Sequence, residues 1–155
     1  MKGYLIATGA ILLPLGAYYI TKSMLNAEPE RVVVCTSELR IHSDNCSFSG
    51  VFKLRAAEGK GVVLVSGSYR LQSGGTGNLN RTVFFDYARH ENMLDMVSNK
   101  ITTALSDNAR ETELASILPP FYFSPATHHS FEMYKQADGY IITGTVLPFA
   151  YCLRG

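Results

Sequence analysis

Glycine-rich loops can bind phosphate, and the sequence contains one such run, Ser73-Gly74-Gly75-Thr76-Gly77-Asn78. A phosphate-binding loop needs a Lys-Ser/Thr pair and a helix after its glycines, whereas a strand-like segment follows this one. We therefore interpret the run as a hairpin loop.

Histidines can hold metals, and His128 and His129 are the one adjacent pair in the sequence. Neighbouring residues of a strand point to opposite faces, so both side chains are poorly placed to hold one ion. We expect a surface or turn position for the pair. The sequence predicts neither a metal site nor a cofactor.

Nucleophilic catalysis would need a Ser or Cys in a strand-to-helix elbow, supported by His and Asp. No GxSxG motif occurs, and Cys46 has no identifiable base. The carboxylates Glu38, Asp86 and Glu132 fall on alternating strand-like segments, where exposure to solvent is expected. The sequence therefore predicts a protein that is not an enzyme.

The elements that must position these residues are mostly strands. β-Branched and aromatic residues alternate with polar ones after residue 30, with turn residues between the runs. The predicted strands are 31–42, 46–56, 62–71, 81–88, 130–136, 140–146 and a bulged closing run, 147–152.

Two segments between the predicted strands have other patterns. Four apolar residues of 91–105 repeat every four positions as on a helix face, but we prefer a returning strand over 93–103. Residues 107–118 predict a helix, capped by Asp107 or Asn108 and ended by Pro119-Pro120. A short extended piece is expected at 121–123.

Seven or eight strands in meander order with one late helix predict a small antiparallel β-barrel or a sandwich, and we prefer the barrel. A barrel of eight strands holds its own side chains or one small ligand. A filled core is the default, and a cavity for an apolar ligand is the alternative. The candidate inward-pointing residues are Phe52, Leu54, Val63, Val65, Phe84, Tyr87, Met93, Phe121, Phe123 and Ile141.

Three cysteines, Cys35, Cys46 and Cys152, match no zinc or CxxC spacing. Outside the cytoplasm two of them are expected to pair. Cys35 lies near the start of the first predicted strand and Cys152 near the end of the last, and these ends meet if a meander closes. We therefore favour Cys35–Cys152, with Cys46–Cys152 as the alternative. In a cytosolic domain all three would be free thiols.

Residues 4–20, YLIATGAILLPLGAYYI, carry no charge. As a helix they would span about 25 Å, a little less than the ~30 Å core of a bilayer. Tyrosines at both ends suit the membrane interfaces, and membrane helices tolerate a proline such as Pro14. We interpret 1–26 as an N-terminal membrane anchor with one transmembrane helix, and 27–155 as an extracytoplasmic β domain. The alternative is a signal peptide cleaved after Ala27.

The charge of the β domain is nearly balanced. Two of the 14 Lys and Arg residues precede residue 27, which leaves 12 against 13 Asp and Glu. No basic stripe is present, so nucleic acid is not an expected partner.

Several short motifs, distributed over nearly the whole chain, carry a resemblance to a known family. They are the apolar segment 4–20, the strand around Cys35, Phe48-Ser49-Gly50, Gly59-Lys60-Gly61, the run from Arg81 to Tyr87, Pro119-Pro120-Phe121-Tyr122, and Pro148-Phe149-Ala150-Tyr151-Cys152. In their arrangement the chain resembles the FidL-like membrane proteins of enteric bacteria. That family is similar in organisation to ToxS-type proteins.

ToxS-type proteins are small inner-membrane proteins that pair with a membrane-anchored winged-helix transcription regulator of the ToxR type. Their periplasmic part forms a lipocalin-like barrel with the regulator's periplasmic domain, and some pairs sense bile salts. The resemblance implies a single-pass protein of the bacterial inner membrane with its C-terminal domain in the periplasm. There it would stabilise or tune such a regulator as part of a small-molecule sensor, with contact at an exposed strand edge. The alternative is a stand-alone periplasmic carrier of a small apolar ligand.

Overall fold

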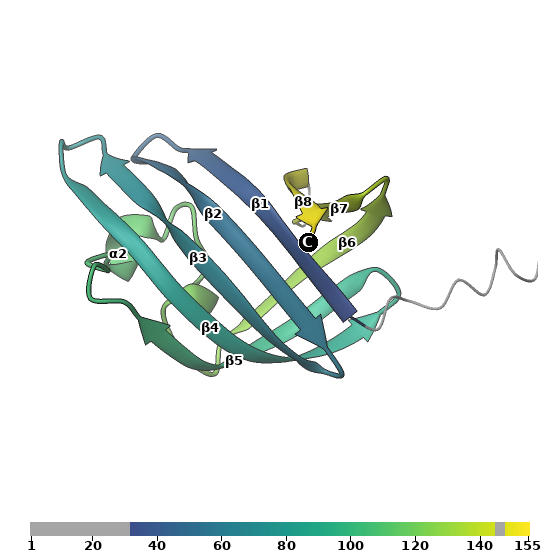
Figure 1. The fold of residues 1–155 in the computed structure, drawn as a ribbon. Coiled ribbons are helices and arrows are strands. Elements are labelled where there is room, and N and C mark those ends of the chain that lie inside the picture. Colours follow the sequence, from purple (N-terminus) through teal and green to yellow (C-terminus); the bar gives the residue numbers. More distant parts are fainter. Residues whose placement is uncertain (1–31, 145–147) are drawn as a thin grey trace, which may run out of the picture. The chain divides into compact units, whose positions relative to one another are not determined.

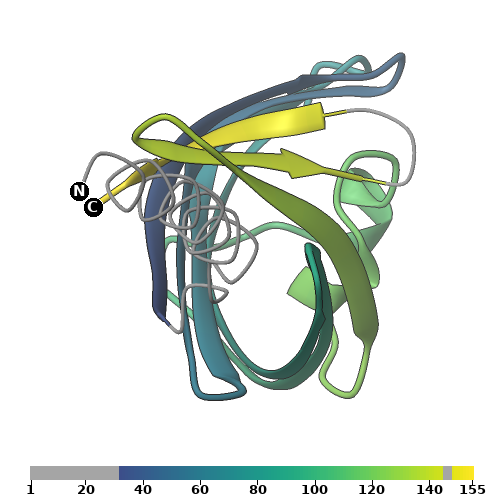
Figure 2. The ribbon, with the colours of Figure 1, turned by 90° about the vertical axis from the view of Figure 1, so that its right-hand side faces the viewer.

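The strands form a closed antiparallel barrel in which each strand pairs with the next and β1 pairs with β8 (Figures 1 and 2). The computed structural model describes residues 32–144 and 148–155. Within them the strands are β1 Val32–His42, β2 Cys46–Ala57, β3 Lys60–Leu71, β4 Thr76–His90, β5 Met93–Thr103, β6 His128–Gln136, β7 Gly139–Thr143 and β8 Pro148–Arg154. The predicted barrel in meander order is confirmed, and the sandwich alternative is wrong.

Alternation of buried and exposed side chains shows which face of each strand points into the barrel. In β1 every second residue from Val33 to Leu39 is buried, and the residues between them are exposed. In β5 the buried residues are Leu94, Met96 and Ser98. The strand preferred over 93–103 is therefore confirmed, and the four-residue apolar repeat there does not mark a helix.

Inward-pointing aromatic rings lie over glycines of the neighbouring strand. A Cβ atom on Gly61 would lie 2.2 Å from the Phe85 ring, and one on Gly77 would lie 2.4 Å from the Tyr69 ring. Both are register partners across β3 and β4. Because glycine has no side chain, each ring can pack directly on the partner's backbone inside a narrow barrel.

The connection from β5 to β6 differs from the sequence prediction. The predicted helix over 107–118 is reduced to α2, Glu111–Leu114, which has no side-chain cap. The extended piece expected at 121–123 is instead part of a 3₁₀ turn, η1, Pro120–Tyr122, because Pro119 and Pro120 favour a tight turn here. Asp107, predicted as a cap, binds Arg81 instead.

A buried ion pair fastens this connection to the barrel. Arg81 of β4 points inward and donates to Asp107 through Nε, at 2.9 Å from Oδ2, and through Nη2, at 3.1 Å from Oδ1. Its Nη2 also donates to the carbonyl of Ala109 at 2.6 Å, and its guanidinium lies 4.6 Å from the ring centre of Phe123. Burial alone would raise the pKa of Asp107, but the hydrogen bonds from Arg81 and two backbone amides hold it below the usual value. The pair is therefore charged and fully hydrogen-bonded.

The core fills the barrel and continues under α2 and η1. Leu114, Leu118 and Phe121 are buried against the strands and close one end of the barrel. A contact between the hydroxyl groups of Ser43 and Ser116, at 3.3 Å, places the turn that follows α2 beside the loop between β1 and β2. Figure 1 shows α2 at this end.

The β4 strand is longer than predicted. It begins at Thr76 rather than at residue 81, so the second half of the glycine-rich run is strand and only its first half forms the turn. The hydrogen bonds of this extension run to β3 and to the β5–β6 connection, where Asn78 N donates to Asn108 Oδ1 at 2.7 Å.

Candidate functional site

The seam where β1 meets β8 is the least complete part of the barrel. β1 pairs with β2 along its whole length, from Val32 to His42. It pairs with β8 at two positions, Cys35 with Arg154 and Thr36 with Leu153. From Ser37 to His42 the β8-facing edge of β1 has no strand partner among the described residues. An unpaired strand edge is a template for a strand of another chain.

A disulfide locks the short pairing at the seam. Cys35 and Cys152 are bonded with an S–S distance of 2.07 Å and a Cα–Cα distance of 5.3 Å. This is the pair favoured by closure of the meander. Cys46, the alternative partner, is free and buried, and burial is the main cause that raises the pKa of its thiol. A neutral, buried thiol of this kind is unreactive.

The outer surface beside the seam is apolar. The exposed fraction is 47% for Val32 and Phe149 and 51% for Leu153. We call this surface the seam face and define it by Val32, Val34, Tyr134, Ile141, Phe149, Tyr151 and Leu153. Ile141 is half-buried and pairs in register with Tyr134 on one side and Tyr151 on the other, which makes the surface continuous across β6, β7 and β8. Contiguous exposed apolar surface of this kind marks interaction sites.

The two tyrosines of the seam face are held in place by hydrogen bonds. Tyr151 donates its hydroxyl to Asp138 Oδ1 at 2.8 Å, and Tyr134 donates to Glu132 Oε2 at 2.8 Å. These hydrogen bonds are the main cause that raises the pKa of both phenols. Rings with fixed positions lose little conformational entropy on binding, which is why aromatic residues dominate protein interfaces.

The ten predicted cavity residues do not surround one cavity. Five of them are buried in the single core of the barrel, namely Phe52, Leu54, Val63, Val65 and Phe121. Tyr87 and Phe123 are partly buried and pack against that core. This packing is that of a filled core, the default expectation, and not that of an apolar cavity.

The inward orientation predicted for Phe84, Met93 and Ile141 is wrong. Phe84 is 42% exposed and Met93 is 39% exposed, and Ile141 lies on the seam face. The reason is the two-residue period of a strand, since a phase error of one residue exchanges the faces. In β4 the inward residues are Val83 and Phe85, on either side of Phe84.

His129 differs from the surface role predicted for the histidine pair. His128 is exposed, but the His129 ring lies against aromatic rings of the core, 5.7 Å from Phe121 and 6.0 Å from Phe131 between ring centres. Burial lowers the pKa of His129, so the ring is neutral at pH 7.

Sequence reasoning missed the seam face, although a signal for it was present. The runs Val32-Val33-Val34-Cys35 and Phe149-Ala150-Tyr151-Cys152-Leu153 are apolar at every position. A strand with one solvated face alternates, so an unbroken apolar run indicates a strand whose two faces are both apolar. Both runs meet at the seam.

The predicted membrane anchor at 4–20 lies outside the described residues. Among residues 32–144 and 148–155, no helix has the length and apolar character needed to cross a membrane.

The barrel can be compared with known proteins. The family model of the YqeJ C-terminal domain matches residues 32–152. The chain belongs to this family. The match extends from the first residue of β1 to the disulfide-bonded Cys152 of β8, so it includes seven complete strands and all of β8 except its last two residues, Leu153 and Arg154. No curated protein and no solved structure gives a significant match.

Proposed function

We propose that this protein is an inner-membrane-anchored periplasmic accessory protein that pairs with a membrane-bound ToxR-type transcription regulator and stabilises or tunes it. The proposal rests on the resemblance to FidL-like proteins, which are similar in organisation to ToxS-type proteins. The structural observation that carries it is the open edge of β1 beside the apolar seam face.

The open edge offers the backbone part of an interface. A partner strand laid along residues 37–42 of β1 would extend the barrel sheet through main-chain hydrogen bonds. Specific side-chain contacts would come from the seam face, where Val34 and Leu153 are exposed near the two β1–β8 pairs. Apolar anchors surrounded by backbone hydrogen bonds are the usual composition of a stable interface core.

The disulfide fits this proposal, and the predicted anchor would add to it. A disulfide between Cys35 and Cys152 suits an oxidising compartment such as the bacterial periplasm. An anchor at 4–20 would confine the barrel to the membrane plane and raise its effective concentration near an anchored regulator.

The proposal includes a small apolar molecule, such as a bile salt, as the signal that the pair senses. The stand-alone carrier is the weaker proposal, because the predicted cavity residues that point inward are packed into one core. A ligand site shared with the partner at the seam is compatible with that packing.

The test is co-purification of the full chain from native membranes in mild detergent, with mass spectrometry of the captured proteins. We expect a membrane-anchored winged-helix regulator with the wild type, and its loss with Val34→Glu and Leu153→Glu on the seam face. Phe84→Glu is the matched control, because Phe84 is a similarly exposed apolar residue on β4 outside the seam face. Absence of any such regulator with the wild type, or undiminished capture by both seam variants, would refute the proposal.

A further inference from the structure

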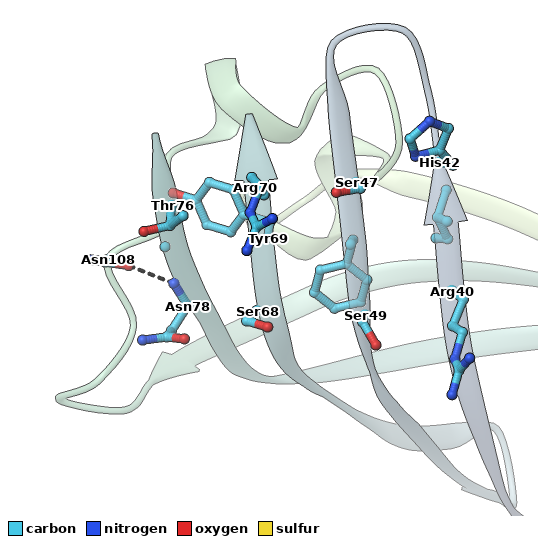
Figure 3. A pocket seen from close by; sticks show the side chains of 13 residues that line it. Arg40, His42, Ser47, Ser49, Ser68, Tyr69, Arg70, Thr76, Asn78 and Asn108 are labelled. Atoms are coloured by element: carbon cyan, nitrogen blue, oxygen red, sulfur yellow. Dashed lines mark hydrogen bonds between the residues drawn. The ribbon is translucent and has the colours of Figure 1, made fainter. Parts of the chain in front are cut away.

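A polar hollow of about 650 Å³ lies over the outer ends of β1 to β4 (Figure 3). Its side chains form two rows across the strands. One row holds Arg40, Ser49, Ser68 and Asn78, and the other holds His42, Ser47, Arg70 and Thr76. We call this hollow the polar basin, and it shares none of the residues of the seam face.

The rows follow from strand register. Arg40 pairs with Ser49, Ser49 with Ser68, and Ser68 with Asn78, so all four side chains point to the same outer face. The serines of β2 and β3 are short and form a low floor, whereas the arginines extend above it. The serines offer hydroxyl groups to a ligand, and the longer side chains around them offer the guanidinium groups of the arginines and the amide group of Asn78.

Two arginines give the lining of the polar basin a positive charge. Arg40 and Arg70 are exposed and make no hydrogen bond or ion pair with another described residue. The lining includes no Asp or Glu. The two arginines lie on β1 and β3 and in different rows, so two strand spacings and a two-residue offset place their Cα atoms roughly 12 Å apart. Their long side chains can reach one anionic group between them or two neighbouring ones.

The aromatic residues of the lining offer no surface on which a flat aromatic ligand could stack. Phe48 and Tyr69 contribute to the lining, but their exposed fractions are 2% and 5%, so neither offers a ring face for stacking. Recognition must come from charge and from hydrogen bonds to hydroxyl and amide groups. Guanidinium pairs bind phosphate and carboxylate, while serine, threonine and asparagine side chains bind sugar hydroxyls.

We propose that the polar basin binds an anionic saccharide, a sugar that carries a phosphate or carboxylate group. The anion lies between Arg40 and Arg70, and the sugar hydroxyls contact the serine floor and Asn78. The same chemistry occurs in soluble sugar phosphates and in the headgroup of a phosphorylated glycolipid. Arg40 and His42 also belong to the open edge of β1 on which the proposed partner strand would lie. The two tests can still fail independently, because the seam variants at Val34 and Leu153 lie outside the basin and the basin variants lie outside the seam face.

The test is isothermal titration of the full chain in non-ionic detergent at low ionic strength. The probes are glucose 6-phosphate, glucose and inorganic phosphate, and a second titration uses lipid A in the same micelles. We expect glucose 6-phosphate or lipid A to bind, with glucose and inorganic phosphate at least about tenfold weaker. Binding of the soluble probe identifies a free sugar phosphate as the ligand type, and binding of lipid A alone identifies a glycolipid headgroup.

Matched variants decide whether the basin is responsible. Arg40→Gln and Arg70→Gln should each weaken binding about tenfold, the usual effect of losing one charge-assisted hydrogen bond. Arg55→Gln is the control, since Arg55 is an exposed outward residue at the other end of β2. The proposal is overturned if neither charged sugar binds, if inorganic phosphate binds as tightly as the sugars, or if Arg55→Gln weakens binding as much as the basin variants.

Discussion

Removal of the Cys35–Cys152 disulfide should strongly destabilise the barrel. The bond joins residues separated by 117 positions, nearly the full length of the β domain. Loop-closure entropy predicts that a cross-link over this distance lowers the entropy of the unfolded chain by an amount equivalent to about 5 kcal/mol at 25 °C. Because β1 and β8 share two residue pairs, little backbone pairing remains at the seam to replace the bond.

The variant to compare is Cys35→Ala/Cys152→Ala, measured by urea unfolding of the full chain in mild detergent and followed by circular dichroism. We expect the free energy of unfolding to fall by about 2 to 5 kcal/mol. Amide hydrogen exchange should rise first in β8, whose pairing to β1 is short. Cys46→Ala is the control, because it removes a buried thiol without breaking a cross-link. A double variant no less stable than this control would refute the reasoning.

Two further predictions concern buried ionisable groups. Arg81→Ala should lower the free energy of unfolding by about 3 to 5 kcal/mol, because the Asp107 carboxylate would be left buried and unpaired. Arg81→Met/Asp107→Ala should recover much of that loss in the same urea assay, and a double variant as unstable as the single one would contradict this. The second prediction is acid sensitivity, since the folded-state pKa values of His129 and Asp107 both lie below their usual values. The unfolded chain then binds protons more readily than the folded one. Stability should therefore fall below about pH 6.5, where His129 of the unfolded chain becomes protonated, and again below about pH 4, where Asp107 of the unfolded chain becomes protonated. His129→Gln should flatten the loss between pH 7 and pH 5 in thermal unfolding, and an unchanged slope would exclude His129 as its cause.

Most strands could be predicted because their signals are local. Alternating apolar residues and turn chemistry mark the strand from Cys46 and the hairpin turn at 137–139, and the structure has β2, β6 and β7 there. The helix over 107–118 was overestimated for a tertiary reason. Asp107 pairs with Arg81, a residue of β4, and this pairing keeps the carboxylate from capping a helix.

The faces of the strands were harder to predict. Phe84 and Phe85 are adjacent aromatics, and local sequence does not show which of them points inward. The structure decides through Gly61, whose missing side chain leaves room for the Phe85 ring and so sets the phase of β4. A contact between two strands is needed to make that choice.

The polar basin was also beyond sequence reasoning. Its arginines, Arg40 and Arg70, are 30 positions apart and have no shared motif. They come to one surface because β1, β2 and β3 pair in a register that puts Ser47 and Ser49 between them.

The sequence by itself determined a mainly β domain with strands in meander order. It favoured a barrel over a sandwich, and Cys35–Cys152 over Cys46–Cys152 as the disulfide. Alternation and turns are local properties, and they are sufficient to place most of the strands but not to close the barrel. Only the tertiary structure decided that β1 and β8 pair at two positions and leave an open edge beside the seam face. The extent of that pairing depends on the curvature and register of the whole barrel, which no single segment of the chain encodes.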